Sequence, residues 1–131
     1  MATVLDLVKA SAVRLALPAV TSAVGSADAH VAQILAAMSA AADELLDRYP
    51  IKRQVLAGKW VRARDGRLLS DISADTDVVL IDEKLMKSAI LWRWRSDNGF
   101  DYAEDFRAVE ERLARLGNEW TKAQSGRTVM L

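Results

Sequence analysis

The chain has 131 residues, an ordinary size for a single domain with one core. Hydrophobic residues make up 51% and charged residues 27%, a balance typical of a soluble globular protein rather than a disordered one. Because 18 Lys and Arg residues are matched by 18 Asp and Glu residues, the net charge is zero. That balance argues against a protein whose main task is to hold a polyanion, which usually requires a basic excess.

The sequence also excludes several kinds of site. It has no cysteine, so disulfides, thiol nucleophiles and cysteine-ligated zinc are impossible. Its uninterrupted apolar runs are only a few residues long, as at 78–81, whereas a membrane span needs roughly 18. We therefore expect no membrane partner.

Two helices are expected in the first half of the chain. Apolar residues recur at helical spacing over residues 3–17, and Pro18 ends that helix because proline has no amide hydrogen. A longer helix is predicted over residues 28–49, ended by Pro50. Its apolar stripe consists of Val31, Leu35, Met38, Ala42, Leu45 and Tyr49. The small residues at 36–42 predict a close approach by another helix.

Residues 51–73 lose the helical period and predict a β-hairpin. Two candidate strands flank the Asp65-Gly66 pair, a sequence that favours a tight turn. Two strands alone are marginally stable, so we expect the hairpin to pack on the helices or on a neighbouring subunit.

Two further helices are expected in the second half. The third covers residues 82–96, with Asp82 as its N-cap, and a turn at 97–99 ends it. The fourth begins at Asp101, which we expect to cap it together with Glu104. Its apolar stripe consists of Tyr102, Phe106, Val109, Leu113, Leu116 and Trp120.

The predicted fold is therefore mainly α. A small four-helix bundle-like domain covers residues 1–123, with one short β-hairpin or loop at 51–73 between the second and third helices. Residues 124–131 are expected to form an extended C-terminal tail, polar at first and apolar at its end. Such an end suits docking into a groove of another protein, and a frayed terminus is the alternative.

The third predicted helix ends in the sequence Trp92-Arg93-Trp94-Arg95. On a helical wheel of about 100° per residue, both tryptophans fall on one continuous apolar arc. Arg93 falls inside that arc, whereas Arg95 falls on the opposite face with lysines. We expect the tryptophans to be structural residues, mostly in the core, Arg93 to be partly buried and Arg95 to be solvated.

A partly buried Arg93 has three interpretations. It can pair with an acid that follows the turn, because an unpaired buried charge is costly. It can instead extend along Trp94 and reach water, or bind a phosphate. Its candidate partners are Asp101, Glu104 and Asp105. The burial predicts that Arg93→Ala lowers stability more than Arg95→Ala.

Candidate partner-binding residues lie on the charged face of the same helix and in the tail. Leu91 falls among charged residues, where a single leucine is either without function or part of a protein contact. The candidates are Leu91, Arg95, Thr128, Val129, Met130 and Leu131. The residues interpreted as structural are Trp92, Arg93, Trp94, Asp101 and Tyr102.

The sequence predicts no catalytic, cofactor-binding or metal site. His30 is the only histidine and lies near the start of an alanine-rich helix, which favours a structural or surface role. The glycines are isolated and form no phosphate loop. An acidic run lacks the spacing of a calcium loop and is interpreted as a solvated loop with an N-cap. Its members are Asp71, Asp75, Asp77 and Asp82. We therefore do not expect an enzyme.

Several sequence features follow one another in a recognisable order. An acidic loop, a leucine-containing helix ending in Trp-Arg-Trp and a Gly-aromatic-Asp-Tyr-Ala-Glu step occupy residues 74–106. The residues concerned are Asp75, Asp77, Asp82, Glu83, Leu85, Trp92, Arg93, Trp94, Gly99, Asp101, Tyr102, Ala103 and Glu104. In the first half, Leu17-Pro18 precedes a helix with Gln33-Ile34-Leu35 that ends in Glu44-Leu45-Leu46-Asp47-Arg48-Tyr49. In these features the chain resembles the head-to-tail adaptor proteins of tailed bacteriophages, also called connector or head-completion proteins.

The resemblance implies a homo-oligomeric ring, most often a dodecamer, beneath the portal protein of the DNA-filled capsid. The ring would carry the tail or a stopper protein. Double-stranded DNA would pass through its lumen with non-specific contacts, in genome packaging and DNA ejection. The implied location is the capsid–tail junction of the virion, after synthesis in the host cytoplasm. In such relatives the C-terminal segment often reaches into the portal, which implies a portal-binding role for residues 125–131.

Two points qualify the resemblance. In longer relatives a β-rich segment lies between the two helical halves, whereas here only residues 51–73 fill that place. The alternative interpretation is a small helical DNA-binding or regulatory protein, with Trp and Arg residues contacting DNA. Zero net charge and tryptophans inside a helix count against that alternative.

Overall fold

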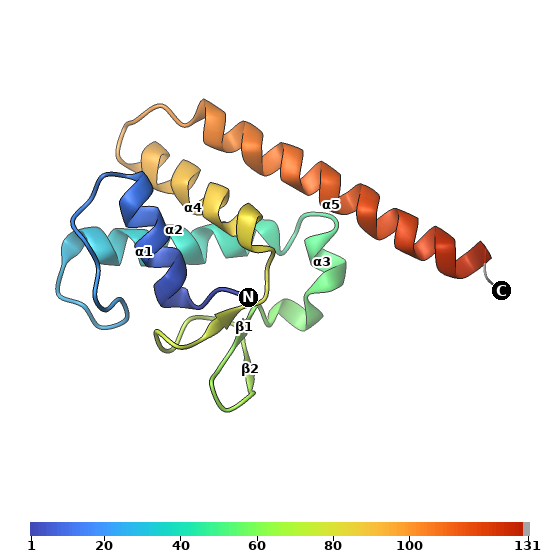
Figure 1. Ribbon diagram of the computed structural model, residues 1–131, viewed down its shortest axis with the longest axis horizontal. Coiled ribbons are helices and arrows are strands. Elements are labelled where there is room, and N and C mark those ends of the chain that lie inside the picture. The colour runs from blue at the N-terminus through green and yellow to red at the C-terminus, as the bar shows by residue number, and fades with distance from the viewer. Residues whose placement is uncertain (130–131) are drawn as a thin grey trace.

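A computed structural model describes the backbone of residues 1–129 and the side chains of residues 1–123 (Figure 1). This part of the chain is mainly helical with a small antiparallel sheet, which confirms the predicted fold class. The helices are α1 (Val4–Arg14), α2 (Ala29–Leu45), α3 (Ile51–Gln54), α4 (Glu83–Asp97) and α5 (Ala103–Val129). The strands are β1 (Val61–Arg62), β2 (Leu68–Leu69) and β3 (Val78–Val79), and a 3-10 turn, η1, covers Leu56–Gly58.

Helix α4 is the central helix of the fold. It packs against α1, α2 and α5 (Figure 1). Asp82 caps it as predicted, since the Asp82 carboxylate accepts the Leu85 amide hydrogen at 3.1 Å. Because helices contact α4 on several sides, it buries more than a single apolar stripe. Its buried residues are Leu85, Met86, Ala89, Ile90, Leu91 and Trp94.

Helix α2 supplies small residues to the contact with α4. Ala37, Ala41 and Ala42 are at most 1% exposed. Small side chains let two helix backbones approach closely, which fits the close approach predicted for residues 36–42. The helix ends at Leu45, earlier than predicted, and Tyr49 lies beyond it with half of its surface exposed.

Helix α1 begins with a capping box at Thr3. The Thr3 hydroxyl accepts the Asp6 amide hydrogen at 3.2 Å, and the Asp6 carboxylate accepts the Thr3 amide hydrogen at 3.1 Å. The hydrogen bonds from Thr3 hold the pKa of Asp6 below its ordinary value. The helix ends at Arg14 rather than at residue 17, because Ala16 adopts a left-handed φ of 54°.

The predicted hairpin is present within the segment 51–73, and a third strand joins it, but residues 51–58 form α3 and η1 where no helix was predicted. Strand β1 pairs antiparallel with β2 on one side and with β3 on the other. Val61 lies opposite Leu69 and Val79. Trp60, which is 1% exposed, donates its indole hydrogen to the Ser70 carbonyl at 2.8 Å. The hairpin therefore packs on the helical core, as its small size requires.

The acidic run that precedes α4 is not simply a solvated loop. Asp77 is 1% exposed, and its carboxylate accepts hydrogen bonds from the amides of Ser73 and Ala74 and from the Ser73 hydroxyl. Burial alone would raise the pKa of Asp77, but these hydrogen bonds outweigh it and hold the pKa below its ordinary value. Asp75 accepts the Ala23 amide hydrogen at 3.1 Å and so ties the loop before α2 to the loop before β3.

Helix α5 differs from its prediction at both ends. It begins at Ala103, so Asp101 stands outside the helix and accepts the Ala103 amide hydrogen at 3.0 Å. Its backbone continues to Val129, where an extended tail from residue 124 was predicted, and its far end projects past the other helices (Figure 1). The side chains of Thr128 and Val129, and the whole of Met130 and Leu131, lie outside the described residues.

Candidate functional site

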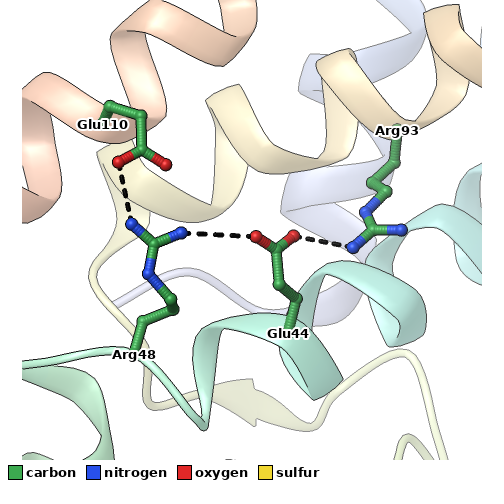
Figure 2. A network of polar contacts seen from close by, with 4 residues as sticks. All are labelled: Glu44, Arg48, Arg93 and Glu110. Atoms are coloured by element: carbon green, nitrogen blue, oxygen red, sulfur yellow. Dashed lines mark hydrogen bonds and ion pairs between the residues drawn. The ribbon is translucent and has the colours of Figure 1, made fainter.

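Four charged residues connect α2, α4 and α5 (Figure 2). Arg93 of α4 donates to Glu44 of α2 at 2.6 Å, and Glu44 also accepts from Arg48 at 3.4 Å. Arg48, just after α2, donates to Glu110 of α5 at 2.8 Å. The hydrogen bond to Glu110 raises the pKa of Arg48, which keeps its positive charge. The network therefore holds three helices together through alternating charges.

The network corrects the partner predicted for Arg93. Arg93 is partly buried as expected, with 28% of its side chain exposed, but it pairs with Glu44 and not with an acid after the turn. Asp105, one of the predicted acids, pairs with Arg95 instead. The expectation that Arg95 is solvated is wrong, since only 26% of its side chain is exposed. The wheel treated α4 as one-sided, whereas α5 folds back over the face that carries Arg95.

Leu91 is also corrected by the structure. Only 5% of the residue is exposed, so it does not stand on the surface of the subunit as the wheel predicted. The reason is again that α4 is enclosed by α1, α2 and α5. Leu91 and Arg95 are therefore used within the chain rather than offered to a partner.

Aromatic side chains gather where α4 turns into α5. The Trp92 ring lies 5.5 Å from Phe106, edge to face, and 5.7 Å from Tyr102, measured between ring centroids. Phe100 stacks on Trp94 at 5.6 Å. Such offset and edge-on pairs are favourable arrangements for aromatic rings. The rings fall in two groups: Trp92 contacts Tyr102 and Phe106, and Trp94 contacts Phe100. The rings of Trp92, Phe100, Tyr102 and Phe106, which come from both groups around this turn, are together called the aromatic patch below.

The aromatic patch is largely on the surface. Phe100 is 58% exposed, Phe106 42% and Tyr102 41%, whereas Trp94, on which Phe100 stacks, is 8% exposed. Trp92 is partly buried, so the prediction of a core position holds fully only for Trp94. The helical stripe predicted that Tyr102 and Phe106 face the core. One sequence signal for a surface patch was available: Phe100 is a large aromatic residue in the turn after Gly99, and turns usually lie on the surface.

Arg93 connects the aromatic patch to the charge network. Its guanidinium carbon lies 4.5 Å from the centroid of the Trp92 ring, a cation–π distance, while its Nη2 donates to Glu44. Trp92 of the patch is therefore in contact with Arg93, whose position is set by its ion pair with Glu44 of α2. Sequence reasoning missed Glu44 because nothing in the local pattern of α2 indicates a partner in α4.

A second ion pair fixes the start of α4 to α5. Arg112 donates from Nε and Nη2 to the two carboxylate oxygens of Asp82, each at 2.9 Å. The bidentate bond lowers the pKa of Asp82 and raises the pKa of Arg112. Asp82 therefore acts both as the helix cap predicted from sequence and as an anchor for α5, a second role that the sequence did not reveal.

Among residues 1–123, no group of three or more His, Asp or Glu side chains is placed to hold a metal ion. His30 is partly buried near the start of α2. None of the helices in the described part of the chain is both long and apolar enough to cross a membrane.

No protein-family model, curated protein or solved structure matches the chain. The aromatic patch is the candidate functional site, because aromatic residues are enriched at protein interfaces and exposed apolar surface gains free energy when a partner covers it. Its arrangement suits binding by surface contact with another protein.

Proposed function

We propose that this chain is a head-to-tail adaptor of a tailed bacteriophage. In this role its copies form a ring that joins the capsid portal to the tail or to a stopper protein, with DNA passing through the lumen. The ring belongs to the capsid–tail junction of the virion. The observation that carries the proposal is the aromatic patch, since it is built from the same segment, 74–106, in which the sequence resembles such adaptors.

The patch has the properties of an interface anchor. Aromatic side chains bury a large area at a low cost in conformational entropy, and they dominate the binding energy of many interfaces. The stacking of Phe100 on Trp94 and the edge-to-face contact of Phe106 with Trp92 hold these exposed rings in place before a partner binds. Preorganisation of this kind lowers the free-energy cost of association.

A ring places specific demands on each subunit. Its interface is heterologous, so a patch on one copy must meet a different surface on the next. The pairs from Arg93 to Glu44 and from Arg48 to Glu110 join α2, α4 and α5 to one another. A subunit held together in this way keeps its shape when it contacts a neighbour on each side of the ring. The projecting end of α5 is the element we propose to reach the portal (Figure 1).

Electron microscopy of the purified protein mixed with portal-containing capsids tests the proposal. We expect a closed ring of this protein at one capsid vertex. A folded protein that forms no ring on such capsids, but binds DNA tightly at physiological salt, would instead support the small DNA-binding alternative.

Matched variants test the part played by the aromatic patch. Phe100→Ser combined with Phe106→Ser is expected to abolish the ring, because it removes two exposed rings. Leu56→Ser is the control, since Leu56 is 73% exposed but lies in η1, outside the patch. Circular dichroism and thermal unfolding establish that both proteins fold. A ring formed equally by both variants would refute the role of the patch.

A further inference from the structure

An open cleft lies between α1, α4 and α5, away from the aromatic patch. Its volume is about 330 Å³. Each helix contributes side chains at helical spacing: Arg14 from the end of α1, three residues from α4 and four from α5. The α4 and α5 residues are Lys84, Lys87, Ser88, Ala108, Glu111, Arg112 and Arg115. We refer to the space between them as the basic cleft.

Positive charge is concentrated in this cleft. Five of its residues are Lys or Arg, and Glu111 is the one acid among those that line it. Lys87 has a partner in Glu83 at 3.5 Å, and Arg112 has Asp82. In a chain of zero net charge, such a local excess raises the concentration of anions at that place.

Three cations of the cleft take part in no ion pair within the described side chains. They are Arg14, Lys84 and Arg115, one from each helix, and all three are exposed. Arg112 binds Asp82 through Nε and Nη2, which leaves its Nη1 group without a partner among the residues described. The Ser88 hydroxyl adds a neutral donor at the same cleft.

We infer that the basic cleft binds a phosphate group. Elsewhere in this protein a carboxylate takes one or two arginines: Asp105 pairs with Arg95 alone, and Glu44 with Arg93 and Arg48. Three free cations from three helices are more than a carboxylate needs. A phosphate group offers several oxygens and up to two charges, which match guanidinium forks and a lysine ammonium together.

Two sources supply a phosphate of this chemistry. It is either a free phosphate compound, such as a nucleotide or pyrophosphate, or the backbone of double-stranded DNA. Binding to the cleft needs only one chain, so it does not depend on ring formation. If DNA is the source, the cleft adds a contact surface for DNA to the proposed adaptor role.

Isothermal titration calorimetry with inorganic pyrophosphate, and fluorescence anisotropy with a short DNA duplex, test the inference on the full chain. The variant Lys84→Gln/Arg115→Gln removes two free cations of the cleft. Its matched control, Lys52→Gln/Arg53→Gln, removes one exposed Lys and one exposed Arg from α3, outside the cleft. All three proteins are first compared by circular dichroism and thermal unfolding.

We expect the cleft variant to bind at least about tenfold more weakly than the wild type, as the loss of two charge-assisted contacts implies, and the control to bind normally. If the protein binds pyrophosphate but not the DNA duplex, the ligand of the cleft is a free phosphate compound. If DNA is bound, the slope of log affinity against log salt is expected to fall by about 1.8 in the cleft variant. The inference is overturned if wild-type protein binds neither probe, or if both double variants lose the same affinity. Intact phosphate binding in the cleft variant, with loss of the ring on capsids, would show that the cleft is a protein interface instead.

Discussion

Arg93 of α4 and Glu44 of α2 form a 2.6 Å ion pair between residues 49 positions apart in the sequence. Less than a third of either side chain is exposed, so water screens the pair only in part. The same guanidinium lies over the Trp92 ring. Arg93 therefore links Trp92, the α4 member of the aromatic patch, to Glu44 of α2.

Removal of Arg93 should destabilise the fold. We expect Arg93→Ala to lower the free energy of unfolding by about 1–2 kcal/mol, because Glu44 loses its shorter ion pair and Trp92 loses its cation–π contact. Urea unfolding measures the change. A double-mutant cycle with Glu44→Ala should give a coupling energy of about 1 kcal/mol. Additive effects of the two substitutions would mean that the pair contributes nothing.

Arg95→Ala should cost at least as much as Arg93→Ala, which reverses the order expected from the helical wheel. The substitution leaves Asp105, a residue only 8% exposed, without its cation. An unpaired, nearly buried carboxylate costs about 2–3 kcal/mol, discounted for the partial exposure of Arg95. Adding Asp105→Asn to Arg95→Ala should restore part of the stability. The idea fails if Arg95→Ala is clearly the milder of the two arginine substitutions in urea unfolding.

Asp77 should contribute stability that depends on pH. Its folded pKa lies below the ordinary value of 3.8, so the folded protein binds fewer protons than the unfolded chain in that range. The contribution is therefore complete above the unfolded pKa and is lost as the pH falls through the folded pKa. We expect Asp77→Asn to cost about 2 kcal/mol at neutral pH, with the difference from wild type shrinking below about pH 4. Urea unfolding across this range measures it.

Asp28→Asn is the control for that experiment. Asp28 is exposed at the start of α2, and its side chain makes no capping hydrogen bond. Its substitution should leave the pH profile of stability close to that of the wild type. A difference between wild type and Asp77→Asn that stays constant from neutral to acidic pH would contradict the proposed hydrogen bonding of Asp77.

The bidentate pair of Arg112 with Asp82 should not tolerate lysine. Arg112→Lys keeps the charge but loses one of the two parallel hydrogen bonds, so we expect a loss of about 1 kcal/mol. The pKa of Asp82 should rise towards its ordinary value, which carboxyl-resolved NMR titration detects. Arg107→Lys, at an exposed position of the same helix, is the control and should change neither quantity. An unchanged pKa of Asp82 in Arg112→Lys would rule out the pair as its cause.

Gly117→Ala should stabilise α5 slightly. Alanine in a helix interior is favoured over glycine by about 1 kcal/mol, but its Cβ would lie 3.1 Å from Cε1 of Tyr49. Because Tyr49 is half exposed, its ring can shift, and we expect a net gain of about 0.5 kcal/mol. In a Tyr49→Ala background the gain should rise to about 1 kcal/mol. Thermal unfolding that shows a loss in both backgrounds would contradict this account.

Local sequence patterns were enough to predict four of the helices and the hairpin. Apolar residues at spacings of three and four identify α1, α2, α4 and α5, because one face of each helix must leave water. Asp82 was identifiable as a cap and Asp65-Gly66 as a turn, since both depend on hydrogen bonds or dihedral angles of near neighbours. The ends of the helices were predicted less well. The left-handed Ala16 lies past the end of α1 at Arg14, although the helix was predicted to reach residue 17, and α5 continues to Val129.

Which charges pair and which aromatic rings stay exposed depends instead on how the helices pack together. Glu44 meets Arg93, and Asp105 meets Arg95, because α4 lies between α2 and α5 and presents a different partner on each side. A helical wheel describes one helix against an undivided core, so it placed Leu91 in water and Phe106 in the interior, the reverse of what is found. Contacts between segments that are distant in sequence follow from packing geometry, and no local pattern encodes them.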